Sequence, residues 1–93
     1  MEEILEKLAE YVLALSDAQR TGHDANDRPV LSKHLAVSAE MFALLLRHQD
    51  VSAIESLVKS EIKSHGCSFV AGPASENIAH AWTAFVKETG IEH

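Results

Sequence analysis

Hydrophobic residues recur every three or four positions along most of the chain, which is the spacing of one side of an α-helix. Four segments show this period, and none shows the alternation of a half-buried strand. The pattern predicts an all-α fold, either a four-helix bundle or an orthogonal four-helix domain, with residues 1–93 forming one domain. The helices are expected at about 2–20, 29–48, 51–65 and 75–89.

Residues that cap helices mark the ends of these segments. The third helix is expected to begin near Asp50 or Ser52, and Ser52 would form a capping box with Glu55. The fourth helix is expected to begin at Ser75 and to end at Gly90.

The helix over 29–48 is the most apolar of the four, and its large side chains cover more of its circumference than one core-facing stripe needs. One side suits the core and consists of Leu31, Leu35, Phe42, Leu45 and Leu46. A second side carries Val30, Val37 and Leu44 at intervals of seven residues. This helix therefore has two sides that favour burial.

The second side extends into a row with alternating spacings of three and four, which is typical of helix pairing. The row consists of Val30, His34, Val37, Met41, Leu44 and His48. We predict that it is the interface of an isologous homodimer, in which His34 faces His48 of an antiparallel copy. The alternative is that this helix is the central one of the monomer and is covered by the other three.

A second departure from a simple amphipathic pattern is Glu61, which falls on the apolar side of its helix with His65 four residues later. His34 and Ser38 project from the core-facing half of their own helix. If the two helices are neighbours, these side chains converge near Trp82. We predict a ligand-binding pocket formed by His34, Ser38, Glu61, His65 and Trp82.

Imidazole and carboxylate groups suit zinc or iron, but the paired Glu-x-x-His motifs of di-iron bundles are absent from the sequence. We therefore predict no metal and no cofactor. The alternative to a ligand pocket is a buried polar network whose members satisfy one another.

Charge and composition exclude several classes of function. The 93 residues carry 14 acidic and 8 basic side chains, a net charge of −6 at pH 7, and the basic residues are scattered along the chain. Such a chain is not expected to bind nucleic acid or anionic membranes. We expect no membrane-spanning segment, and the glutamates near the start, in place of a basic signal region, favour a cytoplasmic location.

No catalytic motif is recognisable. The four glycines are expected at caps and turns, not in a phosphate-binding loop, and the one cysteine follows a predicted helix C-terminus that disfavours a thiolate. We predict a small cytoplasmic interaction or regulatory module that self-associates through the helix over 29–48. The alternative is a ligand- or metal-binding helical bundle, or an enzyme, with its pocket at His34, Glu61 and His65.

Overall fold

The computed structural model describes the backbone of residues 1–20, 28–65 and 73–91. Its elements are α1 (Glu2–Arg20), α2 (Arg28–His48), the 3-10 turn η1 (Val51–Ile54), α3 (Glu55–His65) and α4 (Pro73–Thr89). The described residues contain four α-helices and no strand, so the predicted all-α four-helix fold is confirmed. Two boundaries differ from the prediction: α4 begins at Pro73, a residue favoured in a first helical turn, and the third helix opens with a separate 3-10 turn.

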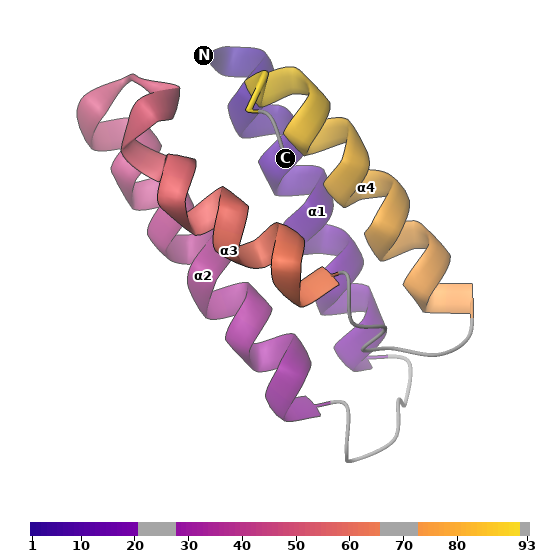
Figure 1. Cartoon of the computed structure of the whole chain (residues 1–93). Helices are drawn as coiled ribbons and strands as arrows, with labels where there is room; N and C mark the ends of the chain where they lie inside the picture. The colour runs from indigo at the N-terminus through magenta and orange to yellow at the C-terminus, as the bar shows by residue number, and fades with distance from the viewer. Residues whose placement is uncertain (21–27, 66–72, 92–93) are drawn as a thin grey trace.

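The helices pack at different densities. α1 and α4 form the most extensive pair, α2 packs on the other flank of α1, and α3 has the sparsest contacts with its neighbours. In Figure 1 α3 lies across the front of the molecule beside α2. α3 therefore covers one side of the arrangement formed by the three longer helices.

Local hydrogen bonds explain where two helices begin and end. The Asp50 carboxylate accepts a hydrogen bond from the Ser52 backbone N–H at 3.0 Å, which holds the pKa of Asp50 below its usual value. Asp50 is thus the cap of the third segment. α4 ends at Thr89, and the next residue, Gly90, has a φ of +72°, a left-handed conformation that glycine adopts without strain.

Among the residues whose side chains the structure describes, the core is apolar apart from three polar side chains. Its buried hydrophobic residues are Leu8, Tyr11, Leu15, Ala18, Leu31, Met41, Leu45, Ile54, Val58, Ile78, Trp82, Phe85 and Val86. The buried polar residues are His34, Ser38 and Glu61. The chain therefore places an imidazole, a hydroxyl and a carboxyl group inside a small hydrophobic core.

The side of α2 that enters the core differs from the one predicted. Its buried residues are Leu31, His34, Ser38, Met41 and Leu45, at spacings of three and four. Leu35 and Phe42 are half-buried at the edge of this face, and Leu46 is 59% exposed. The assignment of Leu46 to the core is wrong, because the apolar pattern surrounds most of the helix and does not show which side faces inward.

The predicted dimer row on α2 is not one continuous exposed surface. His34 and Met41 lie inside the monomer at 1% and 0% exposure. Val30, Val37 and Leu44 are half-buried, and His48 is exposed. A second copy therefore cannot pair with this row as it was predicted, since its centre is already covered by the chain itself.

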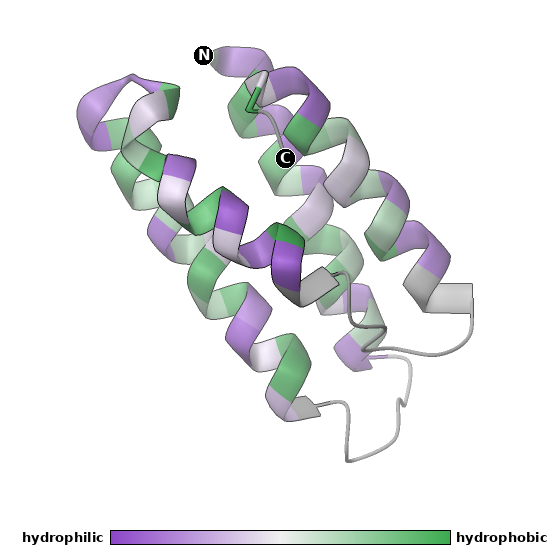
Figure 2. Cartoon of the chain, viewed as in Figure 1, coloured by the Kyte–Doolittle hydropathy of each residue, from purple (hydrophilic) through white to green (hydrophobic). Residues whose placement is uncertain are grey.

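α2 also bears on the expectation that no stretch is long and apolar enough to span a membrane. Among the described residues, Pro29–His48, with 20 residues, is long and apolar enough to cross a membrane. One such helix is weak evidence for a membrane span, because core helices of soluble proteins and signal sequences pass the same test. Hydrophobic positions recur along the whole length of α2 (Figure 2). The expectation that no stretch of the chain is long and apolar enough to span a membrane is therefore wrong for α2, by length and composition only.

Candidate functional site

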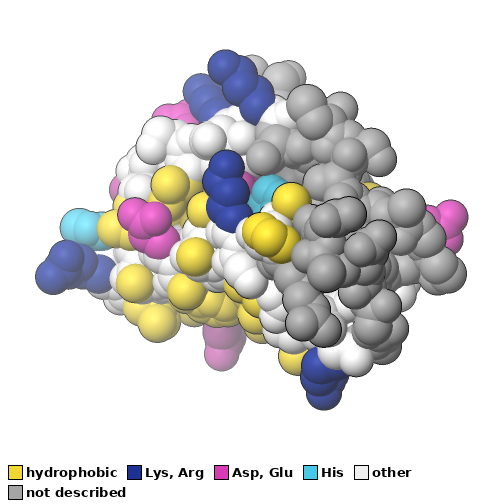
Figure 3. Space-filling model, turned by 90° about the horizontal axis from the view of Figure 1, so that it is seen from below, with side chains coloured by type: hydrophobic (Ala, Val, Ile, Leu, Met, Phe, Trp, Pro, Cys, Tyr) yellow, Lys and Arg dark blue, Asp and Glu magenta, His cyan; other side chains and the backbone are white. Residues whose placement is uncertain are grey.

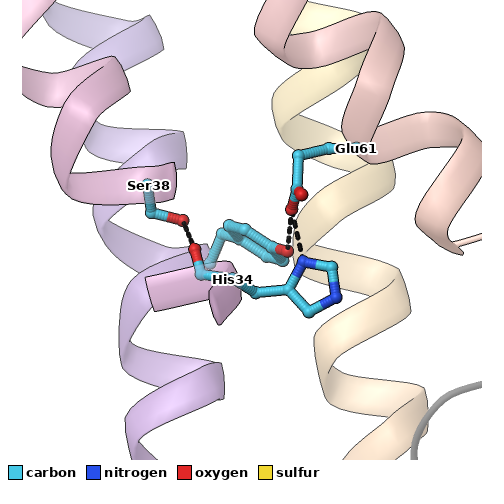
Figure 4. Close-up of polar contacts among 4 residues, drawn as sticks. His34, Ser38 and Glu61 are labelled. Carbon is cyan, nitrogen blue, oxygen red and sulfur yellow. Dashed lines mark hydrogen bonds and ion pairs between the residues drawn. The ribbon is translucent and has the colours of Figure 1, made fainter. Parts of the chain in front are cut away.

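Side chains from three helices meet inside the core. Tyr11 comes from α1, His34 and Ser38 come from α2, and Glu61 comes from α3. Each of the four is at most 3% exposed. Figure 4 shows the Glu61 carboxylate pointing at the His34 ring, with Ser38 one turn further along α2. The predicted convergence of His34 with Glu61 is thus a feature of the structure.

The shortest contact of this cluster joins His34 to Glu61. The Nδ1 atom of His34 lies 2.5 Å from Oε2 of Glu61, and both side chains are almost wholly buried. We assign the donor proton to Nδ1, because a carboxylate oxygen can only accept. A hydrogen bond to an ionised group in a low-dielectric interior is among the stronger contacts available to a small protein.

Tyr11 is a second donor to the same carboxylate oxygen. Its hydroxyl group donates to Oε2 of Glu61 over 3.4 Å, which is a longer and weaker hydrogen bond than the one from His34. Burial raises the pKa of Tyr11 well above its ordinary value of 10.0, and the negative charge and hydrogen bond of Glu61 raise it further. The phenol is therefore held in its neutral, donating form.

Ser38 is buried beside the cluster but bonds elsewhere. Its hydroxyl group donates to the backbone carbonyl of His34 at 2.8 Å, one turn back on the same helix. This is the usual way in which a helix satisfies an interior serine. The prediction grouped Ser38 with the ligand-binding side chains, whereas here its hydroxyl group bonds to the helix backbone.

The other two predicted pocket residues have different positions. Trp82 lies in the core, with its ring centroid 5.0 Å from that of Tyr11 and 5.6 Å from that of Phe85. It therefore packs against the aromatic part of the cluster. His65 is the last residue of α3, and its side chain lies outside the described part of the chain.

Sequence reasoning missed Tyr11 as a polar member of the cluster, because it occupies a regular position in the apolar stripe of α1. The signal that could have identified it is chemical. A buried tyrosine hydroxyl usually finds a hydrogen-bond partner, and Glu61 was already expected on an apolar helix side. A buried donor and a buried acceptor in one small core are expected to meet.

The polar side chains of the cluster do not lack hydrogen-bond partners. Among the described residues, no buried side-chain nitrogen or oxygen lacks a hydrogen-bond partner. No group of three or more metal-binding side chains occurs in the same part of the chain. One described hollow, of about 380 Å³, lies at the surface away from the cluster and is lined by Val51, Ser52, Glu55, Lys59, Gly90 and Ile91. The arrangement is suited to joining three helices.

A different kind of site lies on the exposed side of α2. Leu35, Ala39, Phe42 and Leu46 follow one another at spacings of four, three and four, so they share one side of the helix, which we call the Leu46 flank. Leu46 is 59% exposed, Ala39 is exposed, and the other two are half-buried. The flank carries no charged side chain.

Neighbouring residues show where the Leu46 flank lies in the fold. Ser32 continues the same row towards the start of α2, and its hydroxyl oxygen accepts a hydrogen bond of 3.1 Å from Gln19 of α1. The flank therefore borders α1. Figure 3, which views the molecule from below, shows hydrophobic side chains gathered along the lower left of the surface.

Comparisons of the chain with protein-family models, with curated proteins and with solved structures found no match. Function is accordingly inferred from the residues and their geometry.

Proposed function

We propose that this protein is a small helical interaction module that forms a homodimer through the Leu46 flank of α2. The observation that supports this proposal is a row of apolar side chains at helix-pairing spacing, with Leu46 at its end 59% exposed. A single exposed leucine is ordinary on a protein surface, whereas a charge-free apolar row on one helix is typical of a docking surface. The expected cytoplasmic location stays a prediction.

The flank is complementary to a second copy of itself. In an antiparallel pairing with a two-fold axis between positions 40 and 41, Leu35 lies opposite Leu46 of the second copy. In the same pairing Ala39 lies opposite Phe42, so a small side chain meets a large one. Both contacts occur twice by symmetry. A homodimer is therefore the occupant that the spacing favours.

The energetics predict a weak dimer. Burying the exposed parts of the two Leu46 side chains contributes roughly 2–4 kcal/mol at the usual value per unit of apolar area. Association costs at least about 4 kcal/mol in lost freedom of motion, so Leu35, Ala39 and Phe42 must contribute as well. We therefore expect an equilibrium between monomer and dimer that shifts with concentration.

Sedimentation equilibrium over a range of concentrations tests this proposal. The average mass should rise from 10.2 kDa towards twice that value as concentration increases. Leu46→Glu should weaken association by at least about tenfold, because the dimer would bury two carboxylates against apolar side chains. Leu13→Glu is the matched control, since Leu13 is also exposed, at 60%, but lies on α1 outside the row.

A protein that stays monomeric at the highest concentration would contradict the proposal, and so would equal association of the Leu46→Glu variant and the original chain. The alternative function, a ligand- or metal-binding bundle, gains less support from the geometry. Nδ1 of His34 and Oε2 of Glu61, two of the atoms that would contact a ligand, already bond each other.

A further inference from the structure

α3 has little apolar anchoring compared with the helices around it. Among its described side chains, Val58 and Glu61 are buried, and Leu57 and Ile62 are half-buried. α1 buries four side chains that are apolar or aromatic, Leu8, Tyr11, Leu15 and Ala18. The adjoining η1 adds the buried Ile54, so the described attachment of α3 combines a few apolar side chains with one carboxylate.

Glu61 connects α3 to two helices through one oxygen atom. Oε2 lies 2.5 Å from Nδ1 of His34 on α2, and it accepts the hydrogen bond from Tyr11 on α1. Both contacts end if α3 moves away from the other helices, because its single carboxylate provides them. Figure 4 shows the side chains of three helices meeting at this point.

We infer that α3 covers one side of the other helices and detaches from them as a unit. The contacts of Glu61 with His34 and Tyr11 hold it in the closed position. Moving a carboxylate out of water is costly, and its attraction to buried partners offsets much of that cost without greatly exceeding it. When α3 opens, the carboxylate and imidazole regain water. The opening free energy of α3 is therefore small compared with that of α1 and α4, which are held mainly by apolar contacts.

Opening would change the surface of α2. His34 and Met41 are buried in the closed molecule, and the half-buried Val37 and Leu44 pack against the same core. Loss of the cover exposes these residues on the side of α2 away from the Leu46 flank. The row of α2 residues that the sequence predicts as a homodimer interface would then become accessible. This inference does not depend on the proposed homodimer.

Native-state hydrogen exchange on the full chain, at a concentration where it is monomeric, tests the inference. Amides of α3 are expected to exchange at least about tenfold faster than central amides of α1 and α4. Glu61→Gln should speed exchange in α3 by a further factor of about ten, beyond any change in global stability measured by denaturant unfolding. Glu55→Gln is the matched control, because Glu55 lies on the same helix but is exposed beside Lys59.

A common exchange rate for the centres of α1, α3 and α4 would overturn the inference, because α3 would then open only by global unfolding. Equal acceleration of α3 by Glu61→Gln and Glu55→Gln would overturn it as well. If Glu61→Gln does not fold, Tyr11→Phe provides the test, because it removes only the longer hydrogen bond. Its expected effect is acceleration of roughly two- to fivefold in α3, and no acceleration would overturn the inference.

Discussion

Two contacts in the fold hold their helices in place by different means. One joins α1 to α4, and the other joins α3 to α1 and α2. α4 buries Ile78, Trp82, Phe85 and Val86, all apolar or aromatic, in the most extensive helix pair of the fold. α3 buries Val58 together with Glu61, whose carboxylate meets His34 and Tyr11. One contact is governed by surface removed from water, and the other by the pairing of polar groups.

This difference means that the stability of the fold and the exact position of α3 depend on different contacts. Apolar contacts contribute free energy roughly in proportion to buried area, so a sliding helix loses stability gradually. A buried carboxylate is tolerated only where its partners are in reach, since an unpaired buried charge costs several kcal/mol. α1 and α4 should therefore contribute most of the stability, whereas Glu61 fixes where α3 lies.

The largest expected effect is in the apolar contact. Phe85 is fully buried, with its ring 5.6 Å from that of Trp82. Phe85→Ala should lower the free energy of unfolding by about 3–5 kcal/mol, because it removes apolar contacts and leaves a cavity. Denaturant unfolding followed by circular dichroism measures this change. Thr83→Ala, an exposed change on the same helix, should stay within about 0.5 kcal/mol, and a Phe85→Ala cost of similar size would contradict the comparison.

The polar contact should respond differently when both partners change. His34→Leu leaves the Glu61 carboxylate buried without its closest donor and should cost about 3–5 kcal/mol. Adding Glu61→Met removes that carboxylate, so the double variant should recover at least about half of the loss. Unfolding free energies of the original chain, both single variants and the double variant measure the coupling between the two residues.

Simple addition of the two single-variant costs would show that His34 and Glu61 act independently, and the contrast between the two contacts would then disappear. No such recovery is expected for Phe85→Ala when a second residue of the contact is truncated. A cavity is enlarged, not repaired, by another truncation.

The fold could largely be predicted from the sequence because amphipathic periodicity and capping residues are local signals. The core-facing side of α2 could not, since apolar residues surround most of that helix. Its buried side includes His34 and Ser38, whereas Leu46 is exposed. The side that faces inward also depends on partners on other helices, such as Glu61 for His34, and that information is not local to α2.

The candidate site was partly predictable for a related reason. Glu61 was recognisable because a carboxylate on an apolar helix side conflicts with the pattern around it. Tyr11 was not, since its ring agrees with the pattern and only its hydroxyl group needs a partner. Sequence reasoning finds the residues that break a pattern, and it misses a polar atom carried by a side chain that otherwise fits.

The smallest expected effect is a change of stability with pH caused by Tyr11, the residue that takes part in both contacts. Tyr11 packs on Trp82 of α4 and donates to Glu61 of α3. Its pKa is raised in the folded chain, so the unfolded chain loses this proton first, above pH 10.0. The stability provided by the neutral phenol is thus fully present below that pH, and it falls by about 1.4 kcal/mol per pH unit above it.

Because the chain has one tyrosine, the absorbance of tyrosinate reports on Tyr11 alone. We expect this absorbance to appear together with the loss of helical circular dichroism as the pH rises above 10.0. Tyr11→Phe is the control, since lysines also lose protons in this range, and its stability should depend less steeply on pH. Tyrosinate that forms near pH 10.0 while the helices remain intact would show that the hydroxyl group reaches water in the folded chain. In that case the bond from Tyr11 to Glu61 would not join α1 to α3, and the polar contact would consist of His34 and Glu61 alone.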